Sequence, residues 1–90
     1  MRVVWRELAR DDIMLIVEHI TAENPIAAQR VAGELLLAGE SLLIFPRRGR
    51  VGRFPNTREL VAVLPYILVY RLEDDGLISI LRVWHGARDR

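Results

Sequence analysis

The chain has 90 residues, about half of them apolar, which is enough for one small domain with a single core spanning residues 1–90. It has no cysteine, so disulfides, thiolate metal sites and cysteine nucleophiles are excluded, and a reducing, cytoplasmic setting is predicted. No apolar run is long enough to cross a bilayer, and an early acidic residue argues against a signal peptide.

The net charge of +1 is unevenly distributed. Residues 1–45 carry four arginines and seven acids (net −3), whereas residues 46–90 carry nine arginines and five acids (net +4). Such an asymmetry indicates either a basic surface for a partner or an ordinary solvated surface. All 13 basic residues are arginine, which fits either the binding of phosphate or carboxylate groups or a G- and C-rich coding sequence.

The first half predicts a strand and two helices. Residues 3–5 form a short apolar strand, and apolar residues at helical spacing predict a helix from about Glu7 or Leu8 to Thr21. Asn24 and Pro25 are a cap and a first-turn residue that predict a second helix to about Leu43. Several apolar side chains of this helix lie outside its predicted buried stripe. They are either packed between neighbouring elements or exposed as a partner site: Leu36, Leu37, Leu43 and Ile44.

The second half predicts a basic loop and three strands. Two prolines and two glycines break regular structure over residues 45–56, where Arg47, Arg48, Arg50 and Arg53 make either a solvated connector or a contact for nucleic acid or an acidic protein segment. Strands are predicted over residues 57–63, 66–72 and 77–84, with a hairpin turn at Asp75-Gly76. The predicted fold is α+β, of order β-α-α-β-β-β, with a helical hairpin packed on a mainly antiparallel four-stranded sheet.

Few residues suggest catalysis. His19 has no second ligand at metal spacing and is predicted to lie at the surface, so no metal or other cofactor is expected. His85, at the end of the last strand, either binds a backbone carbonyl or acts as a base. Glu59 is expected in a cross-strand ion pair. Four arginines of the strands and their exit would form a cationic patch if they shared a face, with alternation placing Arg82 beside Ile78 and Ile80: Arg58, Arg71, Arg82 and Arg88.

The order of short motifs along the chain resembles the RelE/ParE superfamily of bacterial toxins, and its ParE branch in particular. The motifs are Asn24-Pro25-x-Ala27-Ala28, Leu43-x-Phe45-Pro46-x-x-Gly49-Arg50, Thr57-Arg58-Glu59-Leu60, Pro65-Tyr66-Ile67-x-Val69-Tyr70-Arg71 and Val83-x-His85-Gly86-Ala87-Arg88. The resemblance implies the β-α-α-β-β-β fold and a cognate ParD-like antitoxin that wraps the toxin. It also implies one of two targets: DNA gyrase for ParE-type members, or ribosome-bound mRNA, which RelE-type members cleave.

Departures from the nuclease pattern favour DNA gyrase as the target, and a protein inhibitor of gyrase is expected to have no catalytic residue. Nucleases of the superfamily tend to carry an arginine where this chain has Ile67, and lysines that this chain lacks. Target contacts are then expected at Arg58, Arg71, Arg82, His85 and Arg88. If the chain is a nuclease, Arg58, Arg82, His85 and Arg88 are its catalytic candidates; a degenerate toxin that only binds antitoxin is a third possibility. Antitoxin contacts are expected at Leu36, Leu37, Leu43, Arg47 and Arg50.

Overall fold

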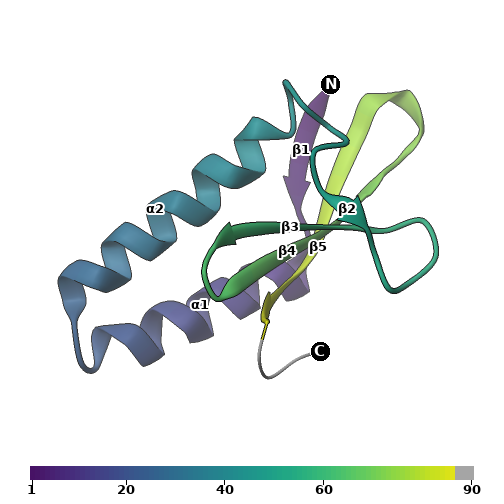
Figure 1. Ribbon diagram of the computed structural model, residues 1–90. Helices are drawn as coiled ribbons and strands as arrows, with labels where there is room; N and C mark the ends of the chain where they lie inside the picture. Colours follow the sequence, from purple (N-terminus) through teal and green to yellow (C-terminus); the bar gives the residue numbers. More distant parts are fainter. Residues whose placement is uncertain (87–90) are drawn as a thin grey trace.

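A computed structural model of the chain describes residues 1–86 and shows two antiparallel helices packed on one face of a five-stranded sheet (Figure 1). The predicted Arg88 lies outside the described residues. The elements are β1 (Arg2–Trp5), α1 (Glu7–Thr21), α2 (Pro25–Ser41), β2 (Arg50–Val51), β3 (Arg58–Val63), β4 (Tyr66–Leu72), a 3₁₀ turn (Asp74–Gly76) and β5 (Leu77–His85). No helix within residues 1–86 is long and apolar enough to cross a membrane.

The strand order is β1-β5-β4-β3-β2, in which β1 and β5 are parallel and all other neighbours antiparallel. The α+β class and element order are therefore confirmed. The count of four strands is wrong because Arg50–Val51, within the expected loop, pairs with Arg58–Glu59 as a two-residue edge strand. Two residues carry too little alternation to be recognised as a strand without their partner.

The helical hairpin follows from local sequence signals. The Asn24 side chain accepts a hydrogen bond from the Ala27 amide at 3.0 Å, which confirms the predicted cap of α2. The buried stripe of α2 includes Val31 and Leu35, is continued by the cap residue Leu42, and packs in one core with Leu68, Tyr70 and Ile80 of the sheet. α2 ends at Ser41, two residues before the predicted end, within the usual uncertainty of helix termini.

The β4–β5 hairpin positions the side chains on both sheet faces. Asp75 and Gly76 have φ angles of 65° and 73°, so the predicted turn is confirmed and both positions favour residues that tolerate left-handed backbone. Farther along the hairpin a register shift places Tyr70 opposite Ile80 but Val69 opposite Arg82, so that Leu81 is an extra, bulged residue. The bulge moves Arg82 to the opposite face from Ile80, and the predicted placement of Arg82 beside Ile78 and Ile80 is wrong.

Candidate functional site

The basic loop between α2 and β3 is anchored to the sheet by a tyrosine. The buried Tyr70 hydroxyl donates to the Pro46 carbonyl oxygen at 2.8 Å and accepts from the Gly49 amide at 3.0 Å. A Cβ atom on Gly49 would lie 2.8 Å from the Tyr70 hydroxyl and 2.9 Å from the Glu59 carbonyl oxygen. Glycine at this position therefore lets the loop backbone approach β3 and β4 closely.

Arg47, Arg58 and Arg71 line one surface cleft of about 620 Å³, which we call the arginine cleft. They come from the basic loop, the first residue of β3 and the end of β4. The Arg58 Nη1 donates to the Gly49 carbonyl oxygen at 2.7 Å and to the Arg47 carbonyl oxygen at 3.3 Å. These two bonds fix the direction of one guanidinium in the cleft.

A carboxylate at the edge of the arginine cleft belongs to a polar network behind it. Glu73 lies 3.3 Å from Arg71 Nε and 3.5 Å from Arg6 Nη2, and it accepts a hydrogen bond from the hydroxyl of Ser79. Arg6 Nη2 also donates to Ser79, which is fully buried, at 2.9 Å. The Ser79 hydroxyl, followed by the charge of Arg71, lowers the pKa of the Glu73 carboxyl below its ordinary value of 4.5, although partial burial opposes that effect.

Glu73→Gln is expected to remove part of the acid sensitivity of the fold. Because the pKa of Glu73 is lowered in the folded state, its contribution to stability is complete above 4.5 and is lost as the pH falls through the lower folded pKa. The stability difference between wild type and variant should therefore be constant near neutrality and shrink below 4.5. Urea unfolding measured at a series of pH values tests this, and parallel curves down to the acid end would contradict it.

Glu59 and Arg50 form the expected cross-strand ion pair. They are register partners in β2 and β3, with Arg50 Nη2 at 3.2 Å from Glu59 Oε1, and Glu59 also accepts from the Arg53 amide at 3.1 Å. The Glu59 side chain is almost fully buried while that of Arg50 is largely exposed. Glu59 therefore holds the two-residue edge strand in place, and Arg50 remains at the surface.

A second cavity lies where α1 crosses the exposed edge of β5. β1 pairs with β5 only as far as Ile80, and beyond it the Asp12 carboxylate accepts from the Val83 amide at 2.9 Å. The same carboxylate holds Arg82 by two bonds, to Nε at 2.8 Å and to Nη2 at 3.1 Å. Asp12 thus serves as the hydrogen-bond acceptor that a neighbouring strand would otherwise provide.

Both histidines line this second cavity, which has a volume of about 400 Å³ and which we call the corner pocket. His85 packs edge-on against Tyr66, with ring centroids 5.6 Å apart. His19 was predicted to lie at the surface without a role, and it is exposed but shares the pocket with His85. The spacing of Asp12, Ile16 and His19 along one helix face was the signal that could have revealed this. Among residues 1–86, no three His, Asp or Glu side chains are placed closely enough to hold a metal ion.

The candidate target-binding residues therefore divide between two places. Arg58 and Arg71 line the arginine cleft, whereas Arg82 and His85 line the corner pocket, and each of these arginines has an intramolecular hydrogen-bond partner. The hypothesis that the arginines form a single cationic patch is not supported for the three described members. Arg88 lies outside the described residues.

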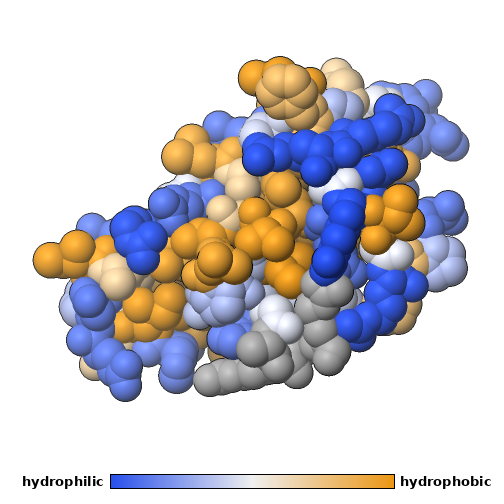
Figure 2. Space-filling model, viewed as in Figure 1, coloured by the Kyte–Doolittle hydropathy of each residue, from blue (hydrophilic) through white to orange (hydrophobic). Residues whose placement is uncertain are grey.

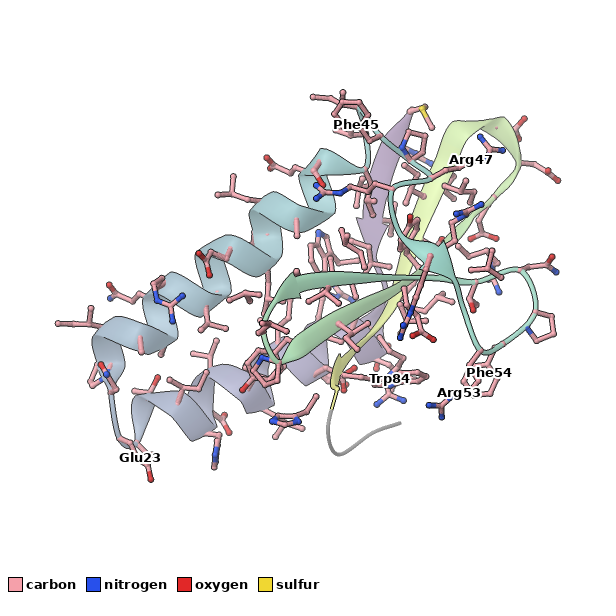
Figure 3. The ribbon with its side chains drawn as sticks, viewed as in Figure 1. Glu23, Phe45, Arg47, Arg53, Phe54 and Trp84 are labelled. Atoms are coloured by element: carbon pink, nitrogen blue, oxygen red, sulfur yellow. The ribbon has the colours of Figure 1, made fainter. Side chains whose placement is uncertain are left out.

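The leftover apolar side chains of α2 form a third surface. Leu36 and Leu37 of α2 are 50% and 66% exposed, and Leu43 and Ile44, just beyond its end, are 41% and 73% exposed, so these side chains are not wedged between elements and leave an apolar surface open. Leu37 and Val61 also line a groove of about 250 Å³ between α2 and β3. Figure 2 shows an apolar patch over this part of the molecule beside a band of strongly hydrophilic side chains, and Figure 3 places Phe45 past the end of α2 and Arg47 farther on, over the sheet. We call the set Leu36, Leu37, Leu43 and the groove the α2 surface.

Comparison with known proteins identifies the class to which this fold and these surfaces belong. Residues 3–90 match the family described as the ParE toxin of the type II toxin–antitoxin system parDE. The chain belongs to this family of toxins.

Individual relatives carry RelE names or a name that indicates neither branch. The chain is 42% identical over 87 residues to Toxin RelE2 of Caulobacter vibrioides, with 97% of each chain covered. It is 39% identical to the putative toxin Y4kP of Sinorhizobium fredii, covering 94% of this chain and 88% of the relative.

Two solved toxin–antitoxin structures share the fold. The chromosomal ParDE system of P. aeruginosa has a TM-score of 0.84 at 22% identity, with 94% of this chain and 95% of that chain covered. The RelBE2 complex of Mycobacterium tuberculosis has a TM-score of 0.66 at 25% identity, with 92% and 94% covered.

Proposed function

We propose that this toxin arrests growth by inhibiting DNA gyrase in the cytoplasm and is neutralised by a cognate antitoxin. The observation that carries the proposal is the separation of the residues that a nuclease would use. Arg58 lines the arginine cleft, while Arg82 and His85 line the corner pocket. In-line cleavage of RNA needs a base for the 2′-hydroxyl and cations at the same phosphate, so residues in two separate cavities do not meet that need.

The centre of the helix-free sheet face supports the same choice. Ile67, at the position where related nucleases tend to carry an arginine, is only 5% exposed and lies opposite Val61 and Trp84 in the neighbouring strands. An apolar side chain there offers no stabilisation to a phosphate charge. Binding to a protein target requires no such cation, which favours inhibition over catalysis.

Supercoiling by purified gyrase tests the proposal directly. We expect the antitoxin-free toxin to inhibit supercoiling and to increase the amount of broken DNA trapped with the enzyme. Addition of the antitoxin should restore activity. Unchanged supercoiling at a large molar excess of a folded toxin would overturn the proposal.

A ribosome-dependent mRNA nuclease is the second candidate, favoured by the names of the RelE relatives and by the corner pocket. That pocket brings His19, His85, Tyr66 and Arg82 together, which includes groups able to exchange protons. Mapping of mRNA ends after induction distinguishes the two functions. Codon-positioned cuts in ribosome-bound mRNA would favour the nuclease, and their absence would remove it.

We propose that the antitoxin binds the α2 surface. Exposed leucines near a groove provide the apolar anchors that a helix or an extended segment needs. Arg48, which lines the groove, and the predicted contacts Arg47 and Arg50 of the following loop can meet its acids. The antitoxin segment would then be amphipathic, with an apolar face toward Leu36, Leu37 and Leu43.

Leu36→Asp and Leu37→Asp are each expected to weaken the toxin–antitoxin complex by about 2 kcal/mol, roughly a 30-fold rise in Kd. Both side chains are at least half exposed, so the fold should tolerate the change. Isothermal titration with purified antitoxin provides the measurement. Ile26→Asp is the matched control, because Ile26 is 81% exposed at the other end of α2. Equal affinity for wild type and both leucine variants would place the interface elsewhere.

A further inference from the structure

We propose that the arginine cleft binds the phosphodiester backbone of duplex DNA, so that the toxin contacts the DNA held by its target as well as the target protein. The proposal rests on the proposed function, in which gyrase is that target. The cleft brings together Arg47, Arg58 and Arg71 from three separate segments of the chain. Most protein–DNA contacts are made to phosphate oxygens, and arginine is well suited to them because its planar fork donates two bonds at once.

The guanidinium of Arg58 is oriented before any ligand binds. Its two hydrogen bonds to the carbonyls of Arg47 and Gly49 both use Nη1. Within residues 1–86, Nε and Nη2 make no hydrogen bond and remain as donors. A side chain that is already ordered loses less conformational entropy when it binds a phosphate. The same bonds hold the loop that carries Arg47, so two of the three cations are positioned together.

The acids of the cleft leave it positively charged. Glu73 is held from behind by Arg6, Arg71 and the Ser79 hydroxyl, so its charge is largely compensated within the protein. Asp74 is exposed at the rim and makes no ion pair with the described residues. The cleft lining carries three arginines and two carboxylates, which leaves a surplus of one positive charge that suits an anion. Removal of the Asp74 charge should increase that surplus.

The surroundings favour a nucleic-acid backbone over an acidic protein segment. The cleft has only two apolar side chains in its lining, Val51 and Leu72, whereas protein partners need buried apolar anchors. Such anchors lie instead on the α2 surface. The cationic side chains also continue beyond the cleft through exposed Arg48, Arg50 and Arg53, and Figure 2 shows strongly hydrophilic side chains running down this face. Further exposed cations in the same loop can neutralise additional backbone phosphates.

An aromatic pair lies beside Arg53 of the same loop (Figure 3). Phe54 and Trp84 are in edge-to-face contact with ring centroids 5.9 Å apart, and Figure 3 shows them beside Arg53. Phe54 is half exposed. Aromatic side chains next to arginines are typical of surfaces that meet nucleic acid, because rings can stack on bases where the duplex is interrupted.

Fluorescence anisotropy with a short labelled DNA duplex at about 50 mM salt tests the proposal. Arg47→Ala and Arg71→Ala should each weaken binding by about three- to tenfold and reduce the salt slope by about 0.9, the value for one lost phosphate contact. Asp74→Asn should tighten binding by a similar factor. Arg30→Ala is the matched control: it removes one positive charge from α2, where Arg30 pairs with Glu34 away from the cleft, and should bind as wild type does.

Each opposite result overturns the proposal. Absence of DNA binding by the folded wild type, or the same loss of DNA affinity in Arg30→Ala as in the cleft variants, would contradict it. So would unchanged DNA binding by Arg47→Ala when its antitoxin binding is weakened, or tighter binding of RNA of the same sequence. Thermal melting of each variant confirms folding. Gyrase supercoiling separates this inference from the proposed function. DNA binding that depends on the cleft, without gyrase inhibition, would reject gyrase as the target but support the cleft as a DNA-binding site. Gyrase inhibition by a toxin that binds no DNA would support gyrase as the target and reject DNA binding by the cleft.

Discussion

Gly39→Ala is expected to lower the free energy of unfolding by roughly 1 to 3 kcal/mol, although alanine is the better helix former. Gly39 lies in α2 directly above the first strand. An added Cβ would come within 2.4 Å of the Trp5 ring and 3.0 Å of the Ile80 side chain. Both neighbours belong to the packed layer between helix and sheet, so the helix would have to move outward. Urea unfolding monitored by tryptophan fluorescence measures the loss.

Gly33→Ala in the same helix is the matched control. A Cβ at Gly33 meets no atom within 4 Å, so only the gain in helix propensity remains. That variant should be more stable than wild type by about 0.5 to 1 kcal/mol. Effects of the same sign at both positions would show that helix propensity, and not the contact with Trp5, decides the outcome.

Tyr70→Phe is expected to destabilise the protein by roughly 2 to 3 kcal/mol and to release the basic loop. The hydroxyl makes two bonds to the loop, to the Pro46 carbonyl oxygen and from the Gly49 amide, and its loss leaves the buried Gly49 amide without that partner. Because the loop supplies Arg47 to the arginine cleft, amide hydrogen exchange should rise at Gly49 and its neighbours. Denaturant unfolding gives the stability change.

Tyr66→Phe provides the comparison in the same strand. Tyr66 is also buried, at 8% exposed, but its hydroxyl makes no hydrogen bond with the described residues. Its removal should change stability by less than about 0.5 kcal/mol. Similar losses at both tyrosines would contradict the view that Tyr70 acts through the loop.

The parts of the fold that depend on local chemistry were predictable from the sequence. Asn24 and Pro25 begin a helix, and Asp75-Gly76 makes a tight turn, because each acts on its own backbone neighbours. The short strand at Arg50–Val51 and the bulge at Leu81 depend on the strand that lies alongside. No local pattern marks them, and the bulge alone was enough to misplace Arg82.

The site was less predictable for the same physical reason. The excess of apolar residues on α2 over one buried stripe is visible in the sequence, but the choice between burial and exposure was left open, and only the structure shows the leucines exposed. The division of the arginines between two cavities could not be predicted from the sequence. Strand register and the position of α1 determine that Arg58 lines one cavity and Arg82 the other. The pairing of Asp12 with Arg82 spans 70 residues and has no sequence signature.

The place of β5 in the sheet has a consequence for synthesis of the protein. β5 lies between β1 and β4, so β1 has no partner strand until residues 77–85 have emerged from the ribosome. The closing contacts join segments that are distant in sequence, which makes them the slowest to form. A growing chain therefore exposes its helical hairpin well before the sheet is complete. We expect truncated products that lack β5 to be unable to complete the sheet.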